Sequence, residues 1–255
     1  MPTADRHAPI RVGTAGWSVP KAVADRFPGD GTHLERYARV LPCVEINSSF
    51  YRPHKPETYA RWASSAPPAF RFAVKVPKAI THVRRLNNAA DLLDRFLMEA
   101  GELGGRLGPL LVQLPPSGRF APDVAGAFFG ELRARFDGDV VCEPRHASWF
   151  TGAAGRLLAE HRVARVAADP APVPDAAEPG GWDGLLYLRL HGSPDIYHSP
   201  YPADALERVA VRLAEEAKRR PVWCIFDNTA LGHATADALT VFSRLAARLA
   251  ARLTG

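Results

Sequence analysis

The stretch that decides the fold is "LLYLRLHG", Leu185 to Gly192. Successive side chains of a β-strand point to opposite faces, which gives this stretch two sets: Leu186, Leu188 and Leu190 on one face, and Tyr187, Arg189 and His191 on the other. The leucine face predicts packing against helices, so the second face must line an enclosed interior. An arginine in such an interior stays charged. We therefore expect Arg189 to pair with a carboxylate, such as Glu143 or Glu45, or with an anionic ligand.

Seven other short apolar runs recur along the chain and predict further strands. They lie at 10–17, 44–46, 70–76, 110–114, 140–144, 163–170 and 222–228. Several are apolar at nearly every residue, as expected where helices cover one face of a strand and a packed interior covers the other. The sequence therefore predicts eight strands.

Amphipathic helical patterns separate most of these runs. They lie at 32–41, 55–66, 89–104, 121–136, 147–161, 204–220 and 234–253. Thr32, with Glu35 three residues later, predicts a capping box at the start of the first helix. The exception is 169–184, after the sixth predicted strand. Its prolines and glycines exclude a long helix there and predict an irregular loop or one short turn.

Eight strands alternating with helices in 255 residues predict an α/β fold, a (β/α)8 TIM barrel. We expect one domain over 1–255, with its core at about 9–250. An open doubly wound sheet also alternates strands and helices, but no GxGxxG loop follows the first strand. Only Gly13 and Gly16 are present there, and we expect both at places where a larger side chain would not fit.

Composition and charge limit the class of protein. Hydrophobic residues make up 47% and charged residues 23%, which are ordinary values for a globular protein with a sizeable core. The net charge of +5 permits nucleic-acid binding but does not indicate it, because much of the arginine lies on predicted helices.

The cysteines and the apolar segments predict a cytoplasmic protein without a membrane partner. Cys43, Cys142 and Cys224 each lie in an apolar run and show no CxxC spacing, which predicts buried, reduced thiols. No apolar run is long enough to cross a bilayer, and the first ten residues lack the apolar region of a signal peptide. The sequence specifies no oligomeric state.

Polar residues follow the carboxyl end of every predicted strand. In a barrel these ends face one mouth, where the chemistry of this fold takes place. In strand order, the residues that we assign to the mouth are Thr14, Gly16 and Trp17; Glu45, Asn47, Ser48 and Tyr51; Lys75; Gln113; Glu143, Arg145, His146 and Trp149; Asp169; Arg189 and His191; and Asp227 and Asn228. One polar strand end is ordinary, but eight at the same end predict a binding face.

Three of these segments carry a family resemblance. They are the Glu-x-Asn-x-x-Phe-Tyr segment at 45–51, the Glu-x-Arg-His-x-x-Trp segment at 143–149 and the Arg-x-His-Gly segment at 189–192. With them the chain resembles the DUF72, or YecE-like, family from about Val12 to Ala238. The resemblance implies a TIM barrel and no assigned function. Asp227–Asn228 departs from the two asparagines usual in the family, which exchanges an amide donor for a carboxylate.

The constellation predicts an enzyme, of the hydrolase, isomerase or lyase kind, that acts on a small anionic or polyhydroxylated substrate such as a sugar phosphate or sugar acid. Arg189, Arg145 and Lys75 would bind the anion. Glu143 or Glu45 would be the general base or acid, with His191 or His146 as its complement. The other substrate-binding candidates are Asn47, Gln113, Tyr51, Trp17, Trp149, Asp227 and Asn228.

Two alternatives remain open. The first is a metal-dependent phosphodiesterase or another nucleic-acid-binding protein, in which aromatic residues at the mouth would stack on bases. The second is a barrel that binds a ligand without catalysis. We expect no cofactor; the alternative is a single Mg²⁺ or Zn²⁺ held by Glu45, Glu143, His191 and Asp227.

Overall fold

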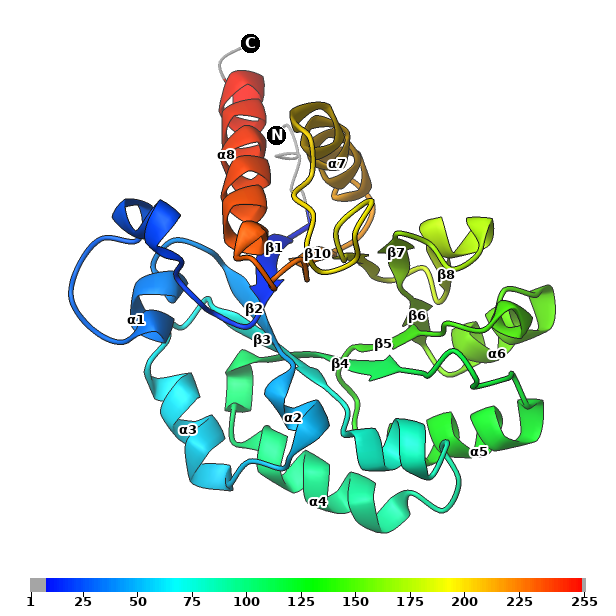
Figure 1. The fold of residues 1–255 in the computed structure, drawn as a ribbon. Coiled ribbons are helices and arrows are strands. Elements are labelled where there is room, and N and C mark those ends of the chain that lie inside the picture. The colour runs from blue at the N-terminus through cyan, green and yellow to red at the C-terminus, as the bar shows by residue number, and fades with distance from the viewer. Residues whose placement is uncertain (1–7, 254–255) are drawn as a thin grey trace, which may run out of the picture.

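The computed structural model describes residues 8–253 and contains a nearly closed barrel of strands with helices around it (Figure 1). The strands of the barrel are β1 (Ile10–Ala15), β2 (Cys43–Ile46), β3 (Arg71–Lys75), β4 (Leu107–Gln113), β5 (Val140–Glu143), β6 (Val163–Arg165), β7 (Ala167–Asp169), β9 (Leu186–Leu190) and β10 (Val222–Phe226). Their order in the sheet is β7, β9, β10, β1, β2, β3, β4, β5, β6, and paired strands run parallel. Their carboxyl ends therefore meet at one mouth, as the sequence predicts.

Within residues 8–253 the sheet has ten strands and not the eight that we expected. The predicted sixth strand is divided at Val166 into β6, which pairs with β5, and β7, which pairs with β9. Because a single residue separates β6 from β7, the chain itself joins the two ends of the parallel sheet. The tenth strand is the two-residue β8 (Gly180–Gly181), which pairs antiparallel with β6. The predicted α/β barrel is otherwise confirmed.

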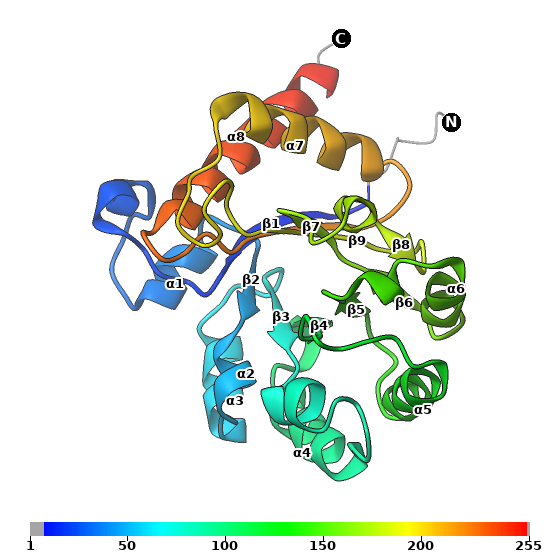
Figure 2. The ribbon, with the colours of Figure 1, turned by 45° about the vertical axis from the view of Figure 1, so that its right-hand side comes forward.

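Helices and short helical turns connect the strands. They are η1 (Lys21–Arg26), α1 (His33–Ala38), α2 (Ser48–Tyr51), α3 (Pro56–Ser64), η2 (Ala79–Val83), α4 (Ala90–Gly101), η3 (Gly104–Arg106), α5 (Pro122–Arg133), η4 (Ala147–Trp149), α6 (Gly152–Glu160), η5 (Pro174–Ala177), α7 (Ala203–Glu216) and α8 (His233–Leu253). Figure 2 shows α7 and α8 together over the part of the sheet that contains β1, and both helices also contact β10. Across the described residues, no helix is both long enough and apolar enough to cross a membrane.

Local signals explain where some of these elements begin and end. The predicted capping box is confirmed: the Thr32 hydroxyl accepts a hydrogen bond from the Glu35 N–H, and the Glu35 carboxylate accepts one from the Thr32 N–H. Between β7 and β9 the chain forms only η5 and β8, as its prolines and glycines predict. The four-residue α2 was not predicted, because it is too short to show an amphipathic repeat.

Two apolar layers lie on opposite faces of the strands. The leucines of β9 belong to the larger layer, which packs with the helices around the barrel. Tyr187 belongs to a smaller layer inside the barrel, together with Leu111, Val141 and Trp223. The alternation predicted for β9 is therefore confirmed. The three cysteines are buried and free, also as predicted.

Gly13 in β1 and Gly16 directly after β1 are glycines for different physical reasons. A Cβ at Gly13 would lie 2.2 Å from the backbone oxygen of Cys43 on β2, so bulk is excluded there, as expected. For Gly16 the expectation is wrong, because a Cβ there would meet no atom within 4 Å. Its φ of +83° is the constraint, since this conformation suits glycine.

We predict that Gly13→Ala lowers the free energy of unfolding by about 3 kcal/mol, because the added methyl group forces β1 and β2 apart. Gly155→Ala in α6 is the matched control, since its Cβ would meet no atom within 4 Å. The control should raise stability by about 0.5–1 kcal/mol, the usual gain for Gly→Ala inside a helix. Urea denaturation of both variants measures the difference, and equal effects would contradict the close approach of β1 and β2.

Candidate functional site

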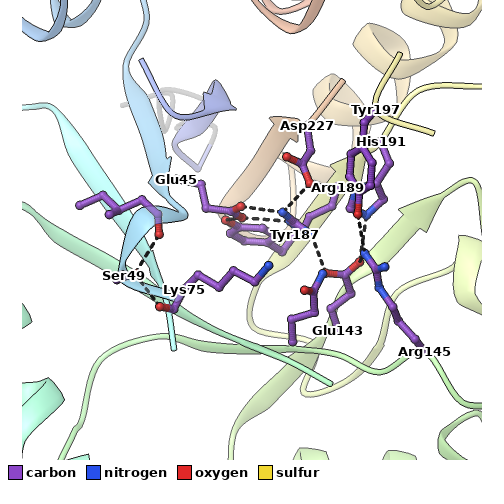
Figure 3. A network of polar contacts seen from close by, with 12 residues as sticks. Glu45, Ser49, Lys75, Glu143, Arg145, Tyr187, Arg189, His191, Tyr197 and Asp227 are labelled. Atoms are coloured by element: carbon purple, nitrogen blue, oxygen red, sulfur yellow. Dashed lines mark hydrogen bonds and ion pairs between the residues drawn. The ribbon is translucent and has the colours of Figure 1, made fainter. Parts of the chain in front are cut away.

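The Arg189 guanidinium lies at the centre of a buried network of charges in the barrel mouth (Figure 3). Its Nε and Nη2 donate to the Glu45 carboxylate at 3.1 and 2.7 Å. Its Nη1 donates to Glu143 Oε2 at 2.6 Å, and Nη2 also donates to Asp227 Oδ2 at 2.9 Å. The predicted pairing of Arg189 is therefore confirmed, with three carboxylates from three different parts of the sheet.

These contacts change the role that Arg189 can have. Its exposed fraction is 0%, and four of its five N–H donors serve the carboxylates. A substrate anion therefore cannot approach it, contrary to the role that we expected. Glu45 is also 0% exposed, and its Oε2 accepts a further hydrogen bond from the Tyr187 hydroxyl at 2.8 Å. Both residues are placed to hold the other charged groups in position.

His191 bridges two of the same carboxylates. Its Nε2 lies 2.9 Å from Glu143 Oε1, and its Nδ1 lies 3.0 Å from Asp227 Oδ2. An ionised carboxylate only accepts hydrogen bonds, so both ring nitrogens must carry a proton. The geometry therefore favours the imidazolium form of His191.

The electrostatics of the network agree with these protonation states. Burial by itself would raise the pKa of Glu143, but the charges of Arg189 and His191 hold that pKa well below its ordinary value. Burial would likewise lower the pKa of His191, but the Glu143 carboxylate outweighs it and the pKa is raised. Burial would raise the pKa of Asp227, and Arg189 lowers it. At neutral pH the site therefore places ionised carboxylates against an imidazolium.

Further polar groups complete the network around Glu143. Gln113 Nε2 donates to Glu143 Oε2 at 2.7 Å, and Arg145 Nη2 lies 3.4 Å from Glu143 Oε1. Arg145 Nη2 also lies 3.5 Å from the Tyr197 hydroxyl, and the Tyr197 ring packs edge-on against the His191 ring. Arg145 keeps 27% of its side chain exposed, so unlike Arg189 it can reach an anion in the mouth.

A cavity of about 290 Å³ opens beside this network. Its lining includes Glu143, Arg145, His191, Pro170, Pro172 and Ile196. The prolines belong to the segment that replaces a helix after β7, and Ile196 belongs to the loop after β9. The cavity therefore combines a carboxylate, a guanidinium and an imidazolium with an apolar wall.

Lys75 enters the mouth from the end of β3, on the side opposite β9 (Figure 3). Its ammonium lies 4.2 Å from the centroid of the Phe50 ring, and the residue is 7% exposed. Burial and the charge of Arg189 lower its pKa to about 8, although Glu45, Glu143 and Asp227 oppose this. Lys75, which the sequence predicted as an anion-binding residue, therefore lies in the mouth near the charged network.

Four predicted residues lie outside the network, and their assignment to the ligand site is corrected here. The Trp149 indole is 1% exposed and donates to Gly118 O at 2.9 Å, so it packs in the core. Asn228 is 0% exposed and donates to Asp237 and to Ser199 O. His146 Nδ1 accepts a hydrogen bond from the Ser148 N–H as an N-cap, and among the described residues the His146 ring makes no hydrogen bond to the network. Tyr51 lies on α2 with 77% of its surface exposed.

Asn47 and Trp17 lie together at a second cavity, of about 280 Å³, on the β1–β2 side of the mouth. The Trp17 ring packs edge-on against Trp62, with the two centroids 5.0 Å apart. The buried Asn47 Oδ1 has no hydrogen-bond partner among the described residues. The structure thus separates these two residues from the cavity that Glu143 lines.

Two members of the network were not among the site residues predicted from the sequence. The alternation of β9 placed Tyr187 on the interior face with Arg189, but we assigned it no role there. Tyr197 lies in the loop after β9, where no periodic pattern assigns a direction to its side chain. In the part of the chain that the structure describes, no three or more His, Cys, Asp or Glu side chains are arranged to hold a metal ion.

Comparisons with known proteins place these features in a family. A family model described as "Protein of unknown function DUF72" matches residues 11–254. The chain is 35% identical over 178 residues to UPF0759 protein YecE of Escherichia coli K12, which covers 67% of this chain and 62% of the relative. It is 24% identical over 150 residues to UPF0759 protein YunF of Bacillus subtilis, which covers 56% and 52%. Each match thus spans less than two thirds of the relative's own length.

Solved structures of DUF72 family proteins share the fold. One from Thermotoga maritima has a TM-score of 0.78 at 23% identity, covering 93% of this chain and 99% of that one. One from Enterococcus faecalis has a TM-score of 0.75 at 24% identity, covering 92% and 95%. At these identities the likeness confirms the barrel and does not extend to activity.

We predict that Arg189→Met lowers the free energy of unfolding by about 3–5 kcal/mol at pH 7, because it leaves three buried carboxylates without their shared cation. Arg208→Met is the control, since Arg208 pairs with Asp204 on an exposed face of α7 and its loss should change little. Urea denaturation compares the two variants. A loss at Arg189 no larger than at Arg208 would contradict the central role of Arg189.

We predict that His191 titrates above its ordinary pKa of 6.5 in the folded protein. A raised folded pKa means that its contribution to stability is fully present below about pH 6.5 and is lost as the pH rises through the folded value. NMR of the histidine rings measures the midpoint, with His191→Gln to assign the signal. His54 is the internal control, because burial and then the Arg52 charge lower its pKa. A His191 midpoint at or below 6.5 would refute the imidazolium assignment.

Proposed function

The chain belongs to the DUF72 family, and we propose that it is an enzyme that binds a small anionic or polyhydroxylated substrate in the barrel mouth and acts on it by acid–base chemistry. The observation that carries the proposal is the Glu143–His191 pair, which lines the 290 Å³ cavity next to the Arg145 guanidinium. The description of the family assigns no activity to its members, so the proposal rests on this geometry.

Glu143 and His191 have complementary protonation states at one surface. The lowered pKa of Glu143 keeps its carboxylate ionised, so that it can accept a proton, and the raised pKa of His191 keeps its imidazolium protonated, so that it can donate one. The same shifts make Glu143 a weaker base and His191 a weaker acid than usual, so a bound substrate must loosen their ion pair before either group reacts. Both side chains are almost fully buried, yet both line the cavity. A bound substrate would therefore meet the two groups with little competing water, which strengthens their interactions with it.

Arg145 supports the anionic character of the substrate. It is the partly exposed cation of the cavity, and its planar group suits a carboxylate or phosphate oxygen pair. We assign Arg189 and Glu45 to positioning rather than to substrate contact, since neither has exposed surface. Gln113 is also assigned to positioning, because its amide donates a hydrogen bond to Glu143 and orients that carboxylate.

The pair suits reactions that remove one proton and deliver another at neighbouring atoms. Glu143 would take a proton from carbon or from a hydroxyl group, and His191 would protonate an adjacent oxygen. Isomerisation and lyase reactions need this combination. Hydrolysis would instead use Glu143 to activate a water molecule. We favour the first two classes, because donor and acceptor lie 2.9 Å apart on one side of the cavity.

The test is a panel of sugar phosphates and sugar acids, with binding measured by thermal shift and turnover by NMR. We predict that Arg145→Met weakens binding of the active compound by at least about tenfold, the loss of one charge-assisted contact. Glu143→Gln should keep binding and lower turnover by about 10²–10⁴-fold. Arg208→Met serves as the control, because Arg208 pairs with Asp204 on α7 and does not line this cavity.

The outcomes separate the proposal from its alternatives. Binding that depends on Arg145 without turnover of any compound would indicate a ligand-binding barrel. Turnover that survives both Glu143→Gln and His191→Asn would remove the acid–base role of this pair. The second variant also guards against misfolding of the first, because each replaces a different member of the network.

A further inference from the structure

Lys75 is the charged group at the mouth whose contacts the acid–base proposal leaves unexplained. Among the described residues, its Nζ makes no hydrogen bond or ion pair, and it lies 4.2 Å from the centroid of the Phe50 ring. A ring face attracts an ammonium, but it leaves the N–H groups of the lysine without acceptors from the protein. The structure thus places in the mouth a lysine amine that no oxygen of the described residues occupies.

The surroundings of Lys75 raise the share of the neutral amine above that of an ordinary lysine. The groups that face it are Arg189 from β9, which repels the ammonium, and Glu45, Glu143 and Asp227, which attract it. Burial is the largest influence, and together they bring the pKa to about 8. Desolvation beside another cation is the arrangement that turns a lysine into a nucleophile in imine-forming enzymes.

The position of Lys75 also fits a reaction in the mouth. Its side chain extends from the carboxyl end of β3 toward the carboxylate cluster, as Figure 3 shows. The Ser49 hydroxyl donates to the Lys75 backbone oxygen at 2.7 Å and ties the strand end to α2. The base of the stem is therefore anchored, and Figure 3 shows the amine directed toward the charged cluster that contains Glu143.

We propose that Lys75 is a catalytic nucleophile that forms an imine with the carbonyl carbon of an aldehyde or ketone substrate. This inference rests on the proposed function, since it assigns a substrate class to the same mouth. The phosphate or carboxylate of that substrate would lie at Arg145, and its carbonyl group would lie between Lys75 and Glu143.

The chemistry balances without a cofactor. The neutral Nζ attacks the carbonyl carbon, a C–N bond forms, and one proton moves from the nitrogen to the carbonyl oxygen, which becomes the hydroxyl group of a carbinolamine. The hydroxyl group then leaves as water with a proton from His191, and the nitrogen, which keeps its last proton, becomes the positively charged nitrogen of a protonated imine. This nitrogen withdraws electrons from the neighbouring carbon, which eases removal of a proton there by Glu143. Hydrolysis with one water molecule regenerates the lysine.

The test traps the imine with sodium borohydride, which reduces it to a stable secondary amine. The probe is glycolaldehyde phosphate, with neutral glycolaldehyde as its uncharged match, and peptide mapping locates the adduct on the wild-type chain. We expect labelling of Lys75 to be at least about tenfold faster at pH 7 than labelling of Lys78, because more of Lys75 is unprotonated. Lys78 is exposed and only three residues away.

Two variants complete the design. Lys75→Arg keeps a cation but removes the amine, and it should abolish the fast adduct, whereas Lys78→Arg should leave it unchanged. Arg145→Met should slow labelling by glycolaldehyde phosphate toward the rate with glycolaldehyde. Mapping on the wild-type chain gives the result even if a variant does not fold.

The outcomes distinguish this inference from the proposed function. Arg145-dependent binding of the phosphate probe without a reducible adduct on Lys75 would overturn the imine and leave the acid–base proposal standing. Fast labelling of Lys75 that is equally fast with neutral glycolaldehyde and in the Arg145→Met variant would support the imine and overturn the anion site. Labelling of Lys75 no faster than of Lys78, with no binding of the probe, would overturn both.

Discussion

The interaction on which the mouth depends is the contact of one guanidinium with three carboxylates. Arg189 and Glu45 are 144 residues apart in the sequence, and both are fully buried. Each carboxylate would be costly to bury alone, and so would the arginine. Their common arrangement therefore requires β2, β5, β9 and the end of β10 to be in place together. These charges can therefore be buried in this arrangement only when the barrel is closed.

This constraint divides the inside of the barrel into two regions. Below the mouth the strands fill the interior with apolar side chains such as Leu111, Val141 and Ile225. At the mouth the strands contribute charged groups that Arg189 holds in a fixed arrangement. His191, between Glu143 and Asp227, and Lys75, against Phe50, then meet surroundings that shift their pKa values in opposite directions. One set of charges thus sets the protonation of a carboxylate, an imidazole and an amine within one mouth.

The strand-end rule found most of the network and also explains its own errors. Glu143, Arg189 and His191 lie within a strand or directly after it, where alternation still gives the direction of each side chain. Beyond the end of a strand, the path of the following segment sets the direction of each side chain. Trp149 packs in the core, and Tyr51 on α2 lies at the surface. The neighbours Asp227 and Asn228 point to different sides, so alternation applied one residue further would have separated them.

The sequence alone determined the barrel, most of its strands and the charged character of its mouth, because hydrophobic periodicity and capping are local properties that each segment carries in itself. It also required a partner for Arg189, since the cost of an unpaired buried charge holds in any fold. The tertiary structure alone decided that this partner is a set of three carboxylates, that Arg145 keeps access to the cavity, and that Lys75 has an aromatic ring beside it. Those facts depend on distances between strands far apart in the chain, which closure of the sheet sets and no local pattern contains.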